Sequence, residues 1–155
     1  MQQALDAVFP DGTHNYWRAS FVRGLTDAVI DTVVEHGNRM ASPLSGTVVE
    51  YYGGAPARVD PVSAAFAQRA ADYNIGMTAQ WTDPTETEKH TAWTRDFYQA
   101  IEPFAHGSHL LNFNSEASDA VIRAAFGDNF ARLAEVKRKY DPTNFFSLNL
   151  NIRAA

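Results

Sequence analysis

Apolar and polar residues alternate most regularly over residues 72–81, which predicts a β-strand with one apolar face and one polar or small face. Residues 15–22 and 46–52 are rich in aromatic and β-branched side chains and are also predicted to be strands. The second of these is almost continuously apolar, so we expect it to be buried on both faces or central in the sheet. A short apolar run at 109–113 predicts a fourth strand.

Apolar residues at helical spacing predict four helices. The first covers 27–39, and the second follows Asp83-Pro84-Thr85-Glu86, in which an N-cap, a proline at N1 and an acid at N3 mark a helix start. Two more helices cover 118–126 and 128–140, and Asp141-Pro142 ends the last one. The second helix is expected to pack on the sheet through one apolar face that includes His90 and Phe97.

The order of elements is strand, helix, strand, strand, helix, strand, helix, helix and tail. Because strands and helices do not alternate regularly, we predict an α+β fold: an antiparallel sheet with helices packed on one face, ending in a helical C-terminal segment and tail. At 155 residues the chain is expected to form a single domain, 1–155.

Charge and composition narrow the classes of partner. The net charge is −5, and the longest run of like charge is Lys137-Arg138-Lys139, which ends a predicted helix and complements its dipole. We therefore expect no binding to nucleic acid. No apolar run approaches the ~20 residues of a membrane span, and no signal peptide is evident, so we expect a cytoplasmic protein without membrane contact. The absence of cysteine excludes thiolate chemistry.

Few residues suggest local catalytic chemistry. Gly53-Gly54 is a lone pair without a phosphate-loop pattern, so it predicts only a turn. The five histidines show no ligand spacing, so no metal site is expected. A cofactor-free enzyme that uses His106, His109 or Asp119 is a remote alternative.

Two places could present hydrogen-bonding groups to a ligand. The polar face of 72–81 carries Asn74, Thr78 and Gln80, which we interpret as candidate substrate-binding residues. A solvent-exposed or interface-facing sheet surface explains the same pattern equally well. Asn112 lies within the apolar run 109–113, where its amide needs partners, and is the fourth candidate.

The C-terminal residues 139–152 read Lys-Tyr-Asp-Pro-Thr-Asn-Phe-Phe-Ser-Leu-Asn-Leu-Asn-Ile. This string resembles the Tyr-Asp-Pro-x-Asn-x-Phe-Arg-x-Asn-Gln-Asn-Ile signature of the berberine-bridge-enzyme-like FAD-linked oxidases. Other motifs follow in the family's order. They are Tyr16-Trp17-Arg18-Ala19-Ser20-Phe21, Ser42-Pro43-Leu44-Ser45, Gly53-Gly54-Ala55, Phe66-Ala67-Gln68-Arg69, Trp81 with Asp83-Pro84, and Gly127-Asp128-Asn129-Phe130 before Arg132-Leu133.

The resemblance implies a substrate-domain remainder at roughly 13–115 and a berberine-like C-terminal segment at roughly 108–155. It implies FAD as cofactor, held mainly by an N-terminal FAD-binding domain that this chain is expected to lack. The partners would then be that domain, in cis or in trans, and a small-molecule substrate. Tail amides Asn149 and Asn151 are the expected cofactor contacts.

Several positions depart from the family pattern. Members carry a tyrosine two residues before the strand asparagine, where this chain has Leu110, and plant members carry Glu or Gln where it has Gly76. The tail's usual Arg and Gln are Ser147 and Leu150. Neither Gly nor Leu can take a proton, so the sequence shows no obvious catalytic base, and the catalytic residues are not identified.

Two functions of different classes remain. The first is the substrate-domain and C-terminal portion of an FAD-dependent oxidoreductase that acts on an alcohol, sugar or secondary metabolite, inactive without a flavin domain. The second is a non-catalytic α+β module that binds a ligand or forms a homodimer through exposed apolar surface, including Phe145, Phe146 and Leu148.

Overall fold

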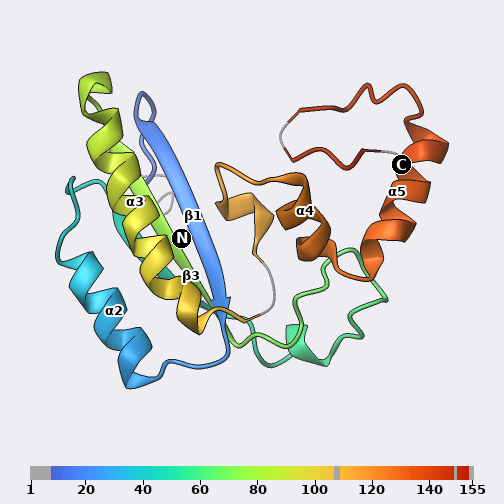
Figure 1. Cartoon of the computed structure of the whole chain (residues 1–155), viewed down its shortest axis with the longest axis horizontal. Helices are drawn as coiled ribbons and strands as arrows, with labels where there is room; N and C mark the ends of the chain where they lie inside the picture. Colours follow the sequence, from blue (N-terminus) through green and yellow to red (C-terminus); the bar gives the residue numbers. More distant parts are fainter. Residues whose placement is uncertain (1–7, 107–108, 149, 154–155) are drawn as a thin grey trace.

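A three-stranded antiparallel sheet forms the centre of the structure, a computed structural model that describes residues 8–106, 109–148 and 150–153 (Figure 1). The strand order is β1-β3-β2. The strands are β1 His14–Val22, β2 Gly46–Tyr51 and β3 Tyr73–Trp81. Helices α2 Asp27–Gly37 and α3 Thr87–Ile101 cover one face of the sheet, whereas α4 Asp119–Phe126 and α5 Asn129–Tyr140 lie beyond it (Figure 1). The predicted α+β fold is confirmed.

The main core lies between β3 and α3. Ile75, Met77 and Ala79 point from the central strand toward Phe97 and Ile101 of α3, and all five are fully buried. Complete burial of a side chain the size of Phe97 or Ile101 contributes about 1.5–3 kcal/mol. The period-two pattern of 72–81 and the helical pattern after Glu86 are therefore two halves of one interface.

Side chains define the helix starts that the sequence predicted. Thr26 accepts a hydrogen bond from the Val29 amide at the start of α2, and Ser118 accepts one from Val121 at the start of α4. Asp83 accepts from the amide and the hydroxyl of Thr85 and caps a short 3₁₀ turn, η2 Pro84–Glu86, that leads into α3. None of the helices in the described ranges is long and apolar enough to cross a bilayer.

The predicted position of β2 was wrong. Strand β2 lies at the edge of the sheet rather than at its centre, and residues such as Val49 and Tyr51 are substantially exposed. The central strand is β3, which pairs with both neighbours. A continuous apolar run does not reveal which neighbours a strand has, and at an edge its β-branched residues cover only one face.

The predicted strand at 109–113 was also wrong. Leu111–Phe113 forms a 3₁₀ turn, η4, beside the outer edge of β1. The turn is followed by side chains that bond this edge directly. The Ser115 hydroxyl accepts from the Trp17 amide at 2.9 Å, and the Asn114 carbonyl Oδ1 accepts from the Ala19 amide at 3.3 Å. Polar side chains thus satisfy backbone groups that a fourth strand would otherwise pair.

The C-terminal tail is attached to α5 by Asp141. Its carboxylate accepts hydrogen bonds from the Lys137 ammonium and from the amides of Phe145 and Phe146. Lys137 also donates to the Phe146 carbonyl. The Lys137 hydrogen bond is the largest influence that lowers the pKa of Asp141. Helix α5 ends at Tyr140, before Asp141-Pro142, as the sequence predicted. The hydrogen bonds of Asp141 then turn the chain back and leave both phenylalanine rings in solvent.

Candidate functional site

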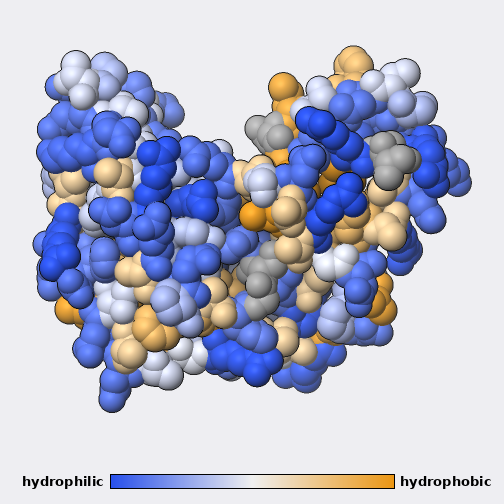
Figure 2. All heavy atoms as spheres, in the orientation of Figure 1, coloured by the Kyte–Doolittle hydropathy of each residue, from blue (hydrophilic) through white to orange (hydrophobic). Residues whose placement is uncertain are grey.

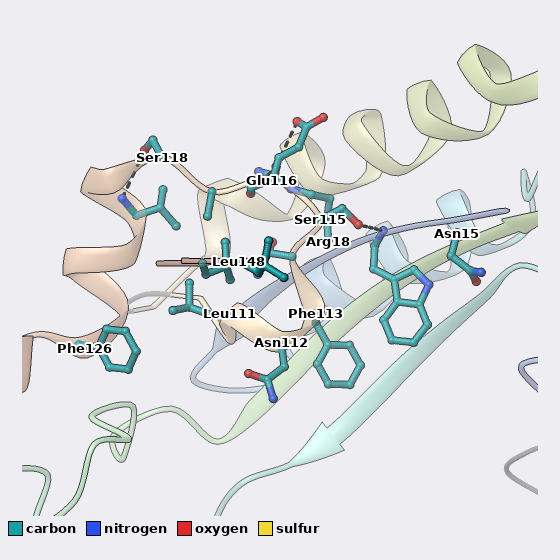
Figure 3. A pocket seen from close by; sticks show the side chains of 15 residues that line it. Asn15, Arg18, Leu111, Asn112, Phe113, Ser115, Glu116, Ser118, Phe126 and Leu148 are labelled. Carbon is teal, nitrogen blue, oxygen red and sulfur yellow. Dashed lines mark hydrogen bonds and ion pairs between the residues drawn. The ribbon is translucent and has the colours of Figure 1, made fainter. Parts of the chain in front are cut away.

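A cleft of about 1250 Å³ separates the sheet from α4 and the C-terminal tail. Its walls come from β1, from η4 and the loop through Ser118, from α4, and from tail residues Leu148 and Leu150. Figure 2 shows the hollow between the two parts of the molecule, with hydrophobic residues gathered on its tail side. In Figure 3, Asn112 and Phe113 point from η4 toward the strands, whereas Leu111 and Leu148 lie toward α4.

An aromatic wall forms the sheet side of the cleft. The ring centroids of Trp17 and Phe113 are 5.6 Å apart with an interplanar angle of 32°. The Phe9 ring lies 5.0 Å from Trp17 but does not itself line the cleft. Trp17 is held by the hydrogen bond between its amide and Ser115. The Trp17 Nε1 group is buried and has no hydrogen-bond partner among the described residues.

The Phe113 ring rests on the middle of β3. Gly76 pairs with Ala19 on one side and Val48 on the other, so small or short side chains form a shallow depression on this face. A Cβ atom at Gly76 would lie 3.5 Å from Phe113 Cδ1 and 3.6 Å from Val48 Cβ. Glycine in a strand interior marks a place where another group approaches closely, and here that group is the Phe113 ring.

Charged groups at the cleft form one connected cluster. Arg18 and Glu116 are the charged side chains among the residues that line it. Glu116 accepts from Arg95 at 3.1 Å, lies 3.9 Å from Arg18, and its backbone carbonyl accepts from Arg18 at 3.3 Å. Burial raises the pKa of Glu116, but its hydrogen bonds with Arg95 and Tyr16 and the Arg18 charge lower it below its usual value overall. Glu116 is therefore held as a carboxylate.

Behind Arg18 lies a partly buried Tyr98–His109 pair. The Tyr98 hydroxyl is 3.1 Å from His109 Nε2, and the Arg18 guanidinium stacks 4.2 Å above the Tyr98 ring. Burial, with a smaller contribution from Glu102, raises the pKa of Tyr98 to about 12. Burial also lowers the pKa of His109, against the opposing influence of Glu102. Both groups are thus neutral at physiological pH, and neither lines the cleft.

Three of the predicted substrate-binding residues are buried side chains of β3. Asn74, Thr78 and Gln80 are almost completely buried, which excludes the alternative of a solvent-exposed sheet face in this chain. Asn74 donates to the Glu50 carboxylate, Thr78 to the Gly46 carbonyl and Gln80 to the Val8 carbonyl. Asn74 Oδ1 and Gln80 Oε1 have no hydrogen-bond partner among the described residues. None of the three lines the cleft, and their role in substrate binding stays a prediction.

The other predicted ligand-binding residues, Asn112, Asn149 and Asn151, lie in different places. Asn112 is exposed rather than buried in a strand, and it lines the cleft. Asn151 lies beside a second, small cavity near Arg123 and Phe130, with a buried Oδ1 that lacks a partner among the described residues. Asn149 lies outside the described residues. Substrate binding by Asn112 and cofactor binding by Asn151 stay predictions.

The alternative of a cofactor-free enzyme that uses His106, His109 or Asp119 gains no support from the surroundings of His109 and Asp119. His109 bonds Tyr98, whereas Asp119 lies in the first turn of α4 beside the small cavity. Over the described ranges, no three His, Asp or Glu side chains converge as a metal site would require.

Sequence reasoning missed Asn15, Trp17 and Phe113 as cleft residues. Trp17 and Phe113 were interpreted only as strand-forming aromatics, and they meet across 96 positions of the chain, counted from their residue numbers. The sequence did contain one signal for Phe113. Asn112 was already a candidate, and the residue next to it in the chain shares its surroundings.

The C-terminal part of the chain matches a known family model. Residues 111–153 match the family described as "Berberine and berberine like". This segment contains η4, α4, α5 and the tail, and therefore most of the wall opposite the sheet.

Curated relatives extend the match to the rest of the chain. An FAD-linked oxidoreductase of Dictyostelium discoideum is 24% identical over 155 residues, which is 99% of this chain and 34% of the relative. The monolignol oxidoreductase AtBBE-like 13 of Arabidopsis thaliana is 33% identical over 119 residues, 68% of this chain and 22% of the relative. The chain thus spans about a third or less of the length of these relatives.

Solved structures agree on the fold. BBE-like 28 from Arabidopsis thaliana superposes with a TM-score of 0.77 at 21% identity, over 93% of this chain and 34% of that protein. A glycopeptide hexose oxidase complexed with teicoplanin gives 0.74 at 26% identity, over 92% and 32%. With the motifs, the family model and the curated relatives, these matches assign the chain to the berberine-bridge-enzyme-like FAD-linked oxidoreductases, of which it corresponds to the C-terminal part.

Proposed function

We propose that this chain supplies the substrate wall and a docking surface of an FAD-dependent oxidoreductase that oxidises an alcohol, a sugar or a secondary metabolite. It acts with a flavin-binding domain, in cis or in trans. The observation that carries the proposal is the cleft of about 1250 Å³, lined by aromatic, amide and leucine side chains. Small-molecule sites usually occupy roughly 300–1,000 Å³, so this cleft has room for a substrate together with part of a second component.

The names of the relatives support this class of substrate. They include a monolignol oxidoreductase, a tetrahydroberberine oxidase from Berberis wilsoniae and a glycopeptide hexose oxidase. These relatives act on different molecules, but each name describes oxidation or redox chemistry of an organic compound.

The cleft residues fit one part of FAD and not another. A flavin ring system is flat and has hydrogen-bonding edges, which matches the aromatic wall and the amides of Asn15 and Asn112. The pyrophosphate needs cations or a cradle of amides. Within the part of the chain that the structure describes, Arg18 is the one cation that lines the cleft, and it is engaged by Glu116. FAD, when bound, supplies the hydride acceptor, and the phosphates are held elsewhere.

The acid–base groups of the cleft favour a role in orienting the substrate over a role in proton transfer. Glu116 is the one carboxylate among the described residues that line the cleft, and it bonds Arg95. Its lowered pKa makes it a weak base for a substrate hydroxyl. The cleft residues therefore orient a substrate through stacking and amide hydrogen bonds, and the base is contributed by the flavin-bearing part of the enzyme.

An absorbance spectrum tests the proposal first. The purified chain is incubated with FAD and desalted, and its spectrum is compared with that of a co-purified complex containing the flavin-binding domain of a relative. We expect the chain alone to be colourless and the complex to retain flavin absorbance. Retention of flavin absorbance by the chain alone would contradict the proposed roles of the chain and the flavin-binding domain. A flavin-binding domain that does not bind the chain would contradict them as well.

A second candidate function is a non-catalytic module that self-associates. The observation that favours it is the exposure of three apolar tail side chains, with Phe145 80%, Phe146 75% and Leu148 87% exposed. Surface of this kind drives association when it is contiguous. Sedimentation at high concentration distinguishes the two candidates, because a persistent monomer argues against the module and a tight homodimer supports it.

A further inference from the structure

We infer that Asp141 is a positioning residue that holds one wall of the cleft in place, and that loss of its carboxylate releases this wall while the rest of the fold stays intact. The tail wall consists of Leu148 and Leu150, the tail residues that line the cleft within the part of the chain that the structure describes. The inference deepens the proposed function, on which it rests for the use of the cleft, because it names the residue that keeps the cleft closed on its tail side.

Asp141 bonds groups on both sides of the junction between α5 and the tail. Its carboxylate accepts hydrogen bonds from the Lys137 ammonium, one turn earlier on α5, and from the amides of Phe145 at 2.7 Å and Phe146 at 3.1 Å. Lys137 also donates to the Phe146 carbonyl at 2.6 Å. We call these four bonds the clasp. The Lys137 and Asp141 side chains are only 13% and 10% exposed, so water competes poorly with their charge-assisted bonds.

The backbone of the turn is shaped to close the clasp. The Asn144 amide donates to the Asp141 carbonyl at 3.0 Å, and Asn144 has a φ of +56°, in the left-handed region that asparagine adopts more readily than most residues. This turn brings the amides of Phe145 and Phe146 to the carboxylate of a residue only four and five positions earlier. The clasp is therefore built by local sequence, without help from the sheet.

Few other contacts hold the tail. Beyond Phe146, no described tail residue makes a hydrogen bond or an ion pair with another described residue. Leu148 is largely exposed, so burial of its apolar surface adds little. Asn151 and Arg153 lie beside the small cavity at α4, which is the other place where the tail meets the body of the molecule. The clasp is thus the main polar attachment of the tail wall.

Release of the clasp should stay local. The rings of Phe145 and Phe146 are already in solvent, so water can satisfy the amides that an open clasp would free. None of the residues in the main core belongs to the tail or to α5. Figure 1 shows the tail beside α4 and α5, away from α2 and α3. The tail wall can therefore leave the cleft without disturbing the packing of the sheet on α3.

The test uses the absence of cysteine, which allows two spin labels to be attached at introduced cysteines. Ser147→Cys places one label on the tail, and Gln99→Cys places the other on the exposed side of α3. Pulsed electron paramagnetic resonance then measures the distance between the tail and the body of the molecule. We expect a single narrow distribution in the labelled parent and a distribution at least about twofold broader when Asp141→Ala is added.

A second measurement separates release of the tail from unfolding. The three tryptophans, at positions 17, 81 and 93, all belong to the sheet or to α3, so urea unfolding followed by their fluorescence reports on the body alone. We expect the unfolding midpoint of Asp141→Ala to stay close to that of the parent. A merely structural role in the main fold would lower this midpoint together with the loss of the narrow distance.

Two further variants identify the bonds that matter. Asp128→Ala is the matched control, because Asp128 is an exposed carboxylate at the other end of α5 whose side chain makes no cap hydrogen bond, and it should keep the narrow distribution. Lys137→Met should give an intermediate width, because the Asp141 carboxylate keeps its bonds to the amides of Phe145 and Phe146.

A narrow distribution in Asp141→Ala would overturn the inference, because other contacts would then be holding the tail wall. A broad distribution in the labelled parent, or a lowered tryptophan-detected midpoint in Asp141→Ala, would overturn it as well. These measurements require neither a flavin nor a ligand, so their failure leaves the association with a flavin-binding domain to be judged by its own experiment.

Discussion

At the scale of single residues, burial determines which polar groups can titrate and which only hold the structure together. Tyr98 and His109 contact each other beside Arg18, and burial moves the two pKa values in opposite directions, each toward the neutral form. The pair links α3 to the segment that follows it and thereby supports the back of the cleft wall. Its electrostatic consequence is a dependence of stability on pH at both ends of the scale.

His109 should make the chain less stable as the pH falls. Its folded-state pKa lies below the ordinary value of 6.5, so below that pH the unfolded chain binds a proton that the folded chain refuses. We expect the free energy of unfolding to decrease as the pH is lowered from about 6.5, and His109→Gln to reduce this slope. Urea titrations between pH 5 and 8 measure it.

Tyr98 gives the opposite sign at high pH. Its pKa rises from 10.0 to about 12, so stability contributed by the neutral phenol is lost as the pH rises from 10 toward 12.

The His109 prediction for the acid range needs a control. His14→Gln is suitable because His14 is exposed and leaves His109 untouched. An acid slope that is identical in the parent and in His109→Gln would rule out the proposed linkage.

At the scale of elements, the sequence predicted boundaries well where side chains mark them. Asp83 accepts the local hydrogen bonds that its position suggested, and the helices predicted from residues 27 and 118 start at caps formed by Thr26 and Ser118, which the structure adds. The alternation over 72–81 likewise identified the face of β3 that packs on α3. Local signals succeed here because a cap or an alternating pattern depends on a few neighbouring residues.

Prediction from sequence failed where the local structure is determined by residues far away in the chain. The edge position of β2 depends on its pairing with β3. The segment after the 3₁₀ turn at Leu111–Phe113 is held by hydrogen bonds that Ser115 and Asn114 accept from β1 amides 98 and 95 positions away. The candidate site was predicted only at Asn112. Its aromatic partners come from another element, and no local pattern connects them.

Asn114 should be the most important polar residue at the β1 edge. Its side chain accepts from the Ala19 amide and donates to the Leu110 carbonyl at 2.8 Å, and it is buried. Asn114→Ala leaves a buried amide unpaired, which costs about 1–3 kcal/mol. Urea unfolding measures the loss. Asn112→Ala, two positions away and exposed, should change stability by less than about 0.5 kcal/mol. Equal losses in the two variants would refute this account.

At the scale of the whole molecule, the cleft divides the surface into a sheet side and a tail side (Figure 2). The Asp141 carboxylate fixes the chain reversal that presents Phe145 and Phe146 to solvent. Rings held outward by a defined backbone arrangement are suited to contact another protein surface with little loss of backbone freedom.

The outward rings should matter for association and not for folding. Because Phe145 and Phe146 are largely exposed, replacing both by serine should leave the unfolding midpoint nearly unchanged. The same double variant should weaken co-purification with a flavin-binding domain. Val136→Ser, an exposed apolar position on α5, is the matched control. Full retention of the flavin domain by the double variant would show that docking uses other residues.

The Ser115 and Asn114 side chains bond the outer edge of β1, and they thereby determine at which edge of the sheet a further strand can pair. Backbone groups at that edge are already bonded, whereas β2 pairs only with β3 among the described residues and shows Val49 and Tyr51 to solvent. Any additional strand, from the same polypeptide or from a neighbouring molecule, would therefore enter beside β2. If the chain is produced alone, the place to add a lysine against aggregation is β2, since β1 already has its own protection.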